Sequence, residues 1–519
     1  MKDMRNEPQT DRKTQADRKS MFEIKKPDVR RLAVLLSVSV VVSATLMVDF
    51  NPARFVGGAL IALVLLFILY RDIMRYKPTY INNYNMLLLL GLMIVSTLLI
   101  GRVFDYFLTY LSKGLELPGT DTAIYGIPIA AGAMLVALLF DFHTAITFSF
   151  TISLLTGFWL NNSLYPIYTF VGSLTAAFSV IRCKRRSALL RGSFYVVVSN
   201  VIIVLILLIA QNELFTAKVV SALSFAVFSG IAVSSIVSVL LPFLEYVFKI
   251  TTDISLLELL DLNQPLMKML MISAPGTYHH SVIVGNLVES AAEAVGVNPL
   301  LARVSSYYHD IGKIKMPDYF VENQGGAPSK HDKLTPHMSS MIITNHVKEG
   351  IELAKQYKLP QSVIDIIGQH HGASLMTYFY QKAKEHEGEA TPMEDDYKYP
   401  GPKPQTRVAA LVMMADAVEA SSRVLNDPTP ARIAALVDKI INHVFLEGQL
   451  DECELTLRDI SEIKQRFSYI LTGIFHKRID YPGFDFGNAN LSKEQSKNGK
   501  SKPAEDQKGP RQGASPARV

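Results

Sequence analysis

Residues 306–320 read SYYHDIGKIKMPDYF, and this stretch decides the fold of the second half of the chain. Its adjacent His309 and Asp310 offer an imidazole nitrogen and a carboxylate, two suitable ligands for metals such as Mn and Fe. Gly312 and Lys313 follow directly. A single His-Asp pair also occurs by chance, so the interpretation depends on what surrounds it.

Further histidines and one aspartate are dispersed on both sides of this stretch. They are His279 and His280 in GTYHHS, His346 in IITNHVKEG, His370 and His371 in IGQHHGAS, and Asp416 in VMMADAVEA. Apolar residues recur between them at helical spacing, so we expect each on a helix of an all-α fold. A ligand set without thiolates indicates hydrolytic or oxygen chemistry and not a structural zinc site. Two metals about 3.5–4 Å apart need a bridging group, and Asp310 has two oxygens to supply it.

The order of these residues resembles the HD phosphohydrolase superfamily, an all-helical, metal-dependent fold. Longer stretches extend the likeness, namely LLELLDLNQPLMKMLMISAPGTYHHS, HVKEGIELAKQYKLPQSVIDIIGQHHG and YPGPKPQTR. They resemble the seven-transmembrane HD family, typified by the PgpH-type cyclic di-AMP phosphodiesterases, over about residues 55–483. The resemblance implies hydrolysis of cyclic di-AMP to linear pApA.

The resemblance also implies two divalent transition-metal ions, Mn or Fe, and a ligand set in which no position is substituted. The first metal would take His280, His309, Asp310 and Asp416, and the second would take Asp310, His346, His370 and His371. We expect His279 not to be a ligand, but either to be structural or to support a ligand residue from behind.

Asp310 and Lys313 are the expected catalytic residues, with Lys313 placed to hold a phosphate oxygen. Lys403, in the rigid segment YPGPKP, and Arg423, in VEASSRVL, are further candidates for substrate binding. The alternative for Lys403 is a packed connector, and spacing alone does not decide the role of Arg423.

The first half of the chain consists of apolar runs long enough to cross a bilayer, which needs about 20 residues. We predict about eight spans, at 32–49, 55–70, 86–103, 123–140, 144–160, 164–181, 193–210 and 219–247. Lys and Arg gather before the first run and after the second and sixth, which places the N-terminus and the HD domain in the cytosol of a bacterial inner membrane. Ionisable residues are nearly absent from the runs, so an anchor or sensor is favoured over a transporter.

These patterns predict a cytosolic basic tail at 1–31, a transmembrane bundle at 32–248, a connector helix at 249–275, an HD domain at 276–490 and a disordered tail at 491–519. Thr251, Thr252 or Asp253 could cap the connector helix. Where the family usually has a large extracellular domain, this chain has only the interval Asp49–Phe55. Any signal should therefore enter through the bundle, the lipid, the N-terminal tail or the cytosol.

The expected partners are a cyclic dinucleotide, the lipid bilayer and a second copy of the chain. The net charge of +5 lies largely in juxtamembrane clusters and the C-terminal tail, so no DNA or RNA polymer is expected. Rival functions are a cyclic di-GMP phosphodiesterase of the HD-GYP type, a mononucleotide or guanosine-tetraphosphate hydrolase, a non-catalytic nucleotide receptor and a transporter. GASLMTYFY follows His371 and lacks the Gly-Tyr-Pro element of the HD-GYP type. The choice of adenine over guanine rests on the resemblance alone.

Overall fold

The computed structural model describes residues 29–47, 51–77, 80–81, 83–181, 183, 186–326, 328–386 and 392–475. The predicted C-terminal tail and most of the predicted N-terminal tail lie outside these residues. Val29, Arg30 and Arg31 were predicted to belong to that tail, but they form the first turn of helix α2 (Val29–Thr45). A helix can extend past its apolar run because arginine is a good helix former.

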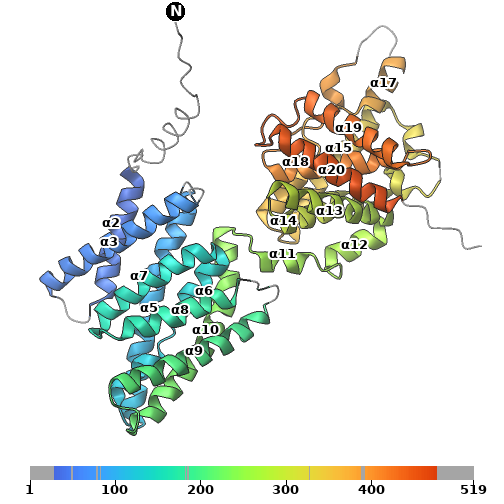
Figure 1. The fold of residues 1–519 in the computed structure, drawn as a ribbon. Helices are drawn as coiled ribbons and strands as arrows, with labels where there is room; N and C mark the ends of the chain where they lie inside the picture. Colours follow the sequence, from blue (N-terminus) through green and yellow to red (C-terminus); the bar gives the residue numbers. More distant parts are fainter. Residues whose placement is uncertain are drawn as a thin grey trace, which may run out of the picture.

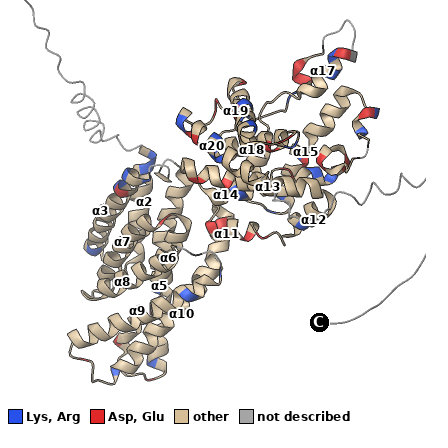
Figure 2. Ribbon diagram, turned by 45° about the vertical axis from the view of Figure 1, so that its right-hand side comes forward, with Lys and Arg blue, Asp and Glu red and all other residues tan. Residues whose placement is uncertain are grey.

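The described residues form an all-α fold in two groups, joined by two short helices (Figure 1). The first group is the bundle: α2, α3 (Pro52–Tyr76), α5 (Tyr84–Gly114), the 3-10 helix η1 (Thr120–Gly126), α6 (Ala130–Leu139), α7 (Phe142–Leu160), α8 (Tyr165–Ser179), α9 (Ala188–Ala210) and α10 (Lys218–Phe248). Its ribbon is almost free of charged residues, as expected of helices in lipid (Figure 2).

The prediction of about eight spans differs from the structure at two of the predicted runs, which form shorter helices. Six segments of the described chain are long and apolar enough to cross a membrane. The runs at 32–49 and 164–181 correspond to α2 and α8, which have only 17 and 15 residues. At 1.5 Å per residue a 15-residue helix is about 22 Å long, less than the hydrocarbon core of about 30 Å.

The segment 104–122, which lies between two predicted spans, is helical as far as Gly114 because α5 continues beyond the predicted end of its span. Its residues remain largely apolar and aromatic, and hydropathy windows do not show where a helix leaves the bilayer. The following run begins as η1 and becomes α6 only at Ala130, so one predicted span consists of two helical pieces.

The predicted connector helix is divided into α11 (Asp253–Leu259) and α12 (Pro265–Ser273). Thr252 caps α11 by accepting a hydrogen bond from the backbone N–H of Ser255, which confirms one of the expected caps. Asp261 accepts from Asn263 in the turn between the helices, and Pro265 begins α12 because it cannot continue the preceding helix.

Helix α11 contributes to the cores on both sides of the junction. Its Ile254 packs with the bundle, whereas Leu256 packs with the soluble half. Arg186, which precedes α9, forms ion pairs with Glu258 of α11 at 2.6 Å and with Glu245 of α10 at 3.7 Å. The connector is therefore tied to the cytosolic end of the bundle.

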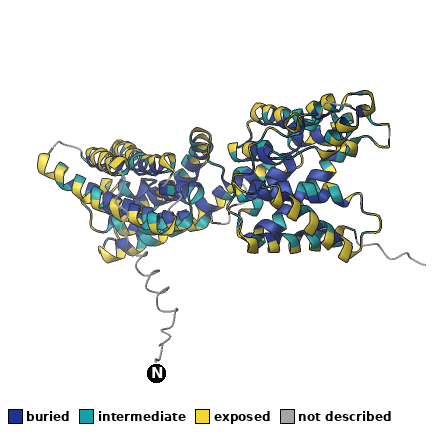
Figure 3. Cartoon of the chain, turned by 90° about the horizontal axis from the view of Figure 1, so that it is seen from above, coloured by how far each residue is buried: buried dark blue, intermediate teal, exposed yellow. Residues whose placement is uncertain are grey.

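The soluble half contains α13 (Pro275–Val295), α14 (Pro299–Tyr308), α15 (Pro336–Gln356), α16 (Gln361–Gln369), α17 (Thr377–His386), α18 (Arg407–Ser422), α19 (Pro430–Leu446) and α20 (Leu457–Ile474). Short 3-10 helices η2 (Ile311–Lys315), η3 (Pro317–Tyr319), η4 (Val321–Asn323), η5 (Lys330–Lys333) and η6 (Glu394–Tyr397) lie between them. Buried residues lie inside both halves of the molecule (Figure 3). In the soluble half, α13 packs against α14, α18 and α20.

A close backbone contact fixes η2 against α15. A Cβ atom added at Gly312 would lie 1.8 Å from the carbonyl oxygen of His346 and 2.6 Å from the backbone nitrogen of Gly350. Only glycine permits this approach. The contact places Asp310, which directly precedes η2, beside His346.

Replacing Gly312 by alanine should push η2 away from α15, because the clash is with backbone and not with a flexible side chain. We expect a destabilisation of about 1–3 kcal/mol, measured as a lower unfolding temperature of the purified chain. Gly368→Ala is the control, since its Cβ would meet only Cδ1 of Ile351 at 3.5 Å. An unchanged unfolding temperature for Gly312→Ala would contradict the contact.

Candidate metal centre

The seven predicted ligand residues converge from five helices of the soluble half. His280 lies in α13, His346 in α15 and Asp416 in α18. The expectation that each of the seven lies on a helix is wrong for the other four. His309 and His370 are the C-caps of α14 and α16, and Asp310 and His371 follow them outside regular α-helix.

One group of ligand atoms comes from His280, His309 and Asp416, all within 4.8 Å of one another. Nε2 of His280 lies 3.0 Å from Oδ1 of Asp416, and Nε2 of His309 lies 3.9 Å from the same oxygen. Both imidazoles are buried, and the side chain of Asp416 is 13% exposed. The cluster can therefore be reached from the solvent at its aspartate.

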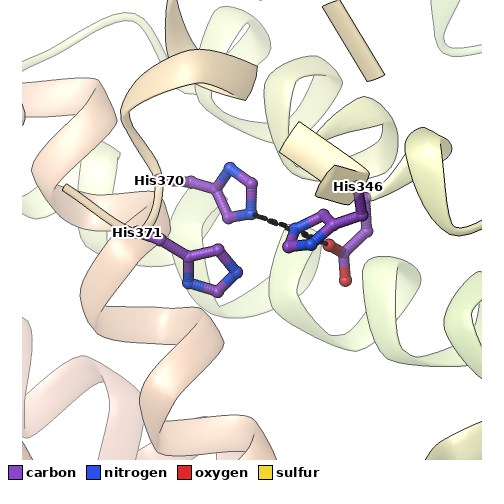
Figure 4. A group of neighbouring side chains, drawn as sticks. His346, His370 and His371 are labelled. Atoms are coloured by element: carbon purple, nitrogen blue, oxygen red, sulfur yellow. Dashed lines mark hydrogen bonds and ion pairs between the residues drawn. The ribbon is translucent and has the colours of Figure 1, made fainter. Parts of the chain in front are cut away.

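The second group comes from His346, His370, His371 and Asp310, with the three imidazoles gathered around one space (Figure 4). Nε2 of His346 and Nε2 of His370 are 3.4 Å apart. Oδ1 of Asp310 lies 3.3 Å from the first of these nitrogens and 3.7 Å from the second.

Asp310 lies between the two groups and presents one oxygen to each. Its Oδ2 is 3.2 Å from Nε2 of His309 and 3.8 Å from Nε2 of His280, whereas Oδ1 faces His346 and His370. Nε2 of His280, Nε2 of His309 and both oxygens of Asp310 are buried without a hydrogen-bond partner among the described residues. Buried polar atoms are rarely left unsatisfied, so these four atoms fit the ligands of two metal positions with a shared carboxylate.

Hydrogen bonds to the other ring nitrogen fix three of the imidazoles. Nδ1 of His309, His346 and His370 lies 2.5–2.7 Å from a backbone carbonyl three residues earlier, contributed by Ser306, Ile343 and Ile367. A carbonyl oxygen only accepts, so each Nδ1 donates its proton. In the neutral ring this leaves a lone pair on Nε2, directed into the cluster.

His280 has a carboxylate partner that sequence reasoning missed. Its Nδ1 lies 2.5 Å from Oε2 of Glu419, one helical turn after Asp416 in α18. Arg423, a predicted substrate contact, instead donates from Nε to Oε1 of this glutamate at 2.8 Å, and its Nη2 forms an ion pair with the same oxygen at 2.7 Å. The spacing Asp416-x-x-Glu419 was the available signal, since both side chains share one helix face.

Burial and neighbouring charges shift the pKa values of several groups around Asp310. Burial opposes the ionisation of Asp310, yet His309 and Lys313 hold its pKa well below the usual range. Burial also opposes the charged form of His280, but the carboxylates of Asp416 and Glu419 beside it raise its pKa to about 10. His346 differs, because burial lowers its pKa to about 4 and keeps the ring neutral.

Lys313 lies inside the cluster, as predicted from its place after the His-Asp pair. Its Nζ is 2.7 Å from Oδ2 of Asp310, although not in hydrogen-bond geometry, and donates to Oε1 of Glu322 at 2.9 Å. Nζ also lies 4.9 Å above the ring of Phe320. Glu322 was not predicted, because η4 brings it back to the cluster through a chain of short 3-10 turns that have no helical periodicity.

The segment containing Lys403 approaches the cluster through a different residue. Lys403 donates to the carbonyl of Gly448 at 2.8 Å, and none of its contacts among the described residues reaches the cluster. Tyr399, four positions earlier, stacks on the ring of His371 at 4.2 Å. His279, expected to be structural, is exposed and contacts the ring of Tyr278.

Comparison with known proteins matches two family models in succession. Residues 52–252 match the model described as a 7TM receptor with intracellular HD hydrolase, and residues 277–421 match the HD domain. The first segment contains seven of the described α-helices, α3 and α5 to α10.

Two characterised relatives are cyclic-di-AMP phosphodiesterases named PgpH. The Bacillus subtilis protein is 41% identical over 69% of this chain and 51% of its own length. The Listeria monocytogenes protein is 39% identical over 72% of this chain and 53% of its own length. The chain thus spans about half the length of these relatives. A crystal structure of the Listeria HD domain in complex with cyclic-di-AMP is 47% identical and covers 42% of this chain and all of its own, with a TM-score of 0.40.

The two matched segments follow each other along the chain, the 7TM segment first and the HD domain second. Apolar helices precede a helical domain whose His and Asp residues converge on Asp310. Over these two segments the chain is similar to proteins that join a 7TM module to an intracellular HD domain.

Proposed function

We propose that this chain is a metal-dependent phosphodiesterase of the bacterial inner membrane that hydrolyses cyclic di-AMP to linear pApA. The observation that carries the proposal is the convergence of six His and Asp side chains on Asp310, in a chain about 40% identical to two cyclic-di-AMP phosphodiesterases. The HD domain and the N-terminus would face the cytosol.

The proposed metal positions share Asp310. His280, His309 and Asp416 would complete the first, and His346, His370 and His371 would complete the second. Imidazole and carboxylate donors without thiolate suit Mn or Fe. Bound divalent ions would supply Lewis acidity toward the phosphoryl oxygens and toward water.

The chain's own residues would bind and orient the phosphodiester. Lys313 carries a positive charge into the cluster, because Asp310 and Glu322 raise its pKa although burial opposes its charge. A phosphate oxygen could take the place of Glu322 beside this ammonium. Tyr399 covers one face of His371 and limits access of water from that side.

The proposed domains are the bundle at 32–248, extended to Val29 by the first turn of α2, the connector at 249–275 and the HD domain at 276–490. The bundle would anchor the enzyme or sense an apolar or lipid signal. The proposed partners are the cyclic dinucleotide, the bilayer and a second copy of the chain.

Product analysis separates this function from its rivals. The purified chain is incubated with manganese and, in parallel, cyclic di-AMP, cyclic di-GMP, guanosine tetraphosphate and mononucleotides. We expect pApA from cyclic di-AMP as the main product. Faster turnover of cyclic di-GMP or of a mononucleotide would replace the proposed substrate, and binding of a nucleotide without any product would indicate a receptor.

Asp310→Asn should abolish turnover, because the neutral amide cannot serve both proposed metal positions. We expect kcat to fall at least about a thousandfold, equivalent to about 4 kcal/mol, together with loss of bound metal and an unchanged helical spectrum. Asp395→Asn, at a side chain that is 84% exposed, is the control. Near-normal activity in Asp310→Asn would reject the site.

Lys313→Met should weaken substrate binding while metal remains bound, because its ammonium is the proposed phosphate contact. We expect kcat/KM to fall about 10–100-fold, or about 1.4–2.7 kcal/mol, with metal content measured on the same sample. Lys315→Met, at an exposed lysine two positions later, should change neither quantity. An unaltered kcat/KM in Lys313→Met would remove this residue from the site.

A further inference from the structure

Four imidazoles of the cluster form a hydrogen bond through Nδ1, but their partners differ in charge. His309, His346 and His370 donate to neutral carbonyls within their own helices. His280 donates instead to a carboxylate on another helix, Oε2 of Glu419 in α18. In the first metal position, the ring nitrogen of His280 that faces away from the cluster is therefore hydrogen-bonded to a carboxylate.

Glu419 is itself held so that both oxygens are used. Oε1 accepts from Nε of Arg423 and forms an ion pair with its Nη2, and Oε2 accepts from His280. The side chain of Glu419 is 3% exposed, whereas that of Arg423 is 41% exposed. The arginine therefore fixes the carboxylate from the solvent side and leaves one oxygen directed at the imidazole.

A carboxylate behind an imidazole fixes the tautomer and makes the ring a more basic ligand. The group around His280 also includes Asp416 and shares Asp310. The group around His346 contains one carboxylate, Asp310, and Nδ1 of its His371 lies 3.6 Å from Oδ2 of Asp416, beyond hydrogen-bond distance. A divalent ion is held more strongly where more negative charge surrounds it.

We propose that Glu419, fixed by Arg423, is a positioning residue that makes the His280 position the tighter of two unequal metal positions. The inference rests on the proposed function only in requiring that the cluster binds metal. The second metal position, formed with His346, His370 and His371, then releases its ion first.

The test is a chelator titration of the full chain in detergent, loaded with Mn²⁺. Bound manganese is counted by elemental analysis, and released Mn²⁺ by its electron paramagnetic resonance signal. We expect the wild-type chain to bind two ions and to release them in two separate steps. Glu419→Gln should weaken the late step about 10–100-fold, the usual effect of losing such a partner, so that the two steps merge.

The physical reason is that glutamine cannot satisfy both neighbours. If its oxygen faces Arg423, its NH₂ group faces Nδ1 of His280, and the ring proton moves to Nε2, where the metal must bind. If its oxygen faces His280, its NH₂ group faces the guanidinium of Arg423. Both of these groups are donors, so no hydrogen bond forms between them. Arg423→Met keeps the carboxylate on His280 and should weaken the late step less than Glu419→Gln does.

A His346→Ala background isolates the tighter position. His346→Ala alone should retain one firmly held ion, and His346→Ala with Glu419→Gln should retain it about 10–100-fold more weakly. Glu289→Gln is the matched control, because Glu289 lies in the same helix as His280 and pairs with Arg303 at 2.7 Å. The Glu289→Gln chain should release manganese as the wild-type chain does. The unfolding temperature of every variant is measured without metal and compared with that of the wild-type chain.

The outcomes separate this inference from the proposed function. Two-step release that is unchanged in Glu419→Gln would overturn the role of Glu419 and leave the phosphodiesterase proposal intact. Firm retention of the ion in the double variant would do the same. A wild-type chain that binds no manganese would overturn both.

Discussion

The ionised carboxylate of Asp310 is the constraint on which the arrangement of the soluble half depends. Its side chain is 1% exposed, and neither oxygen has a hydrogen-bond partner among the described residues. Isolating such a charge from water costs several kcal/mol, so the surrounding groups must compensate for it. Lys313 and the converging imidazoles supply that compensation, and the imidazoles are the proposed ligands of two metal positions.

The fold keeps these groups in place with backbone contacts and helix ends. Gly312 lets η2 touch the backbone of α15, which brings Asp310 to His346. Carbonyls one helical turn earlier orient three imidazoles, and Glu419 with Arg423 orients the fourth. Farther away, α11 packs against both cores and its Glu258 pairs with Arg186, so this helix joins the bundle to the domain that carries the site.

The sequence predicted the all-α fold and the residues that converge, because His and Asp recurring in this order along apolar helical segments are typical of a helical metal site. It did not predict Glu419 or Glu322, whose roles depend on contacts between α18 and α13 or on irregular 3-10 turns. Lys403 was a plausible phosphate contact by composition, but the loop turns its ammonium toward Gly448 and directs Tyr399 at His371. The span count failed at α2 and α8 because hydropathy measures apolar length and not where helices begin and end.

Anomalous diffraction at the manganese or iron edge, from crystals of the metal-loaded protein, tests the central claim most directly. The account predicts two peaks about 3.5–4 Å apart, one on each side of Asp310, with one carboxylate oxygen bound to each ion. A single peak, or metal bound away from this carboxylate, would contradict it.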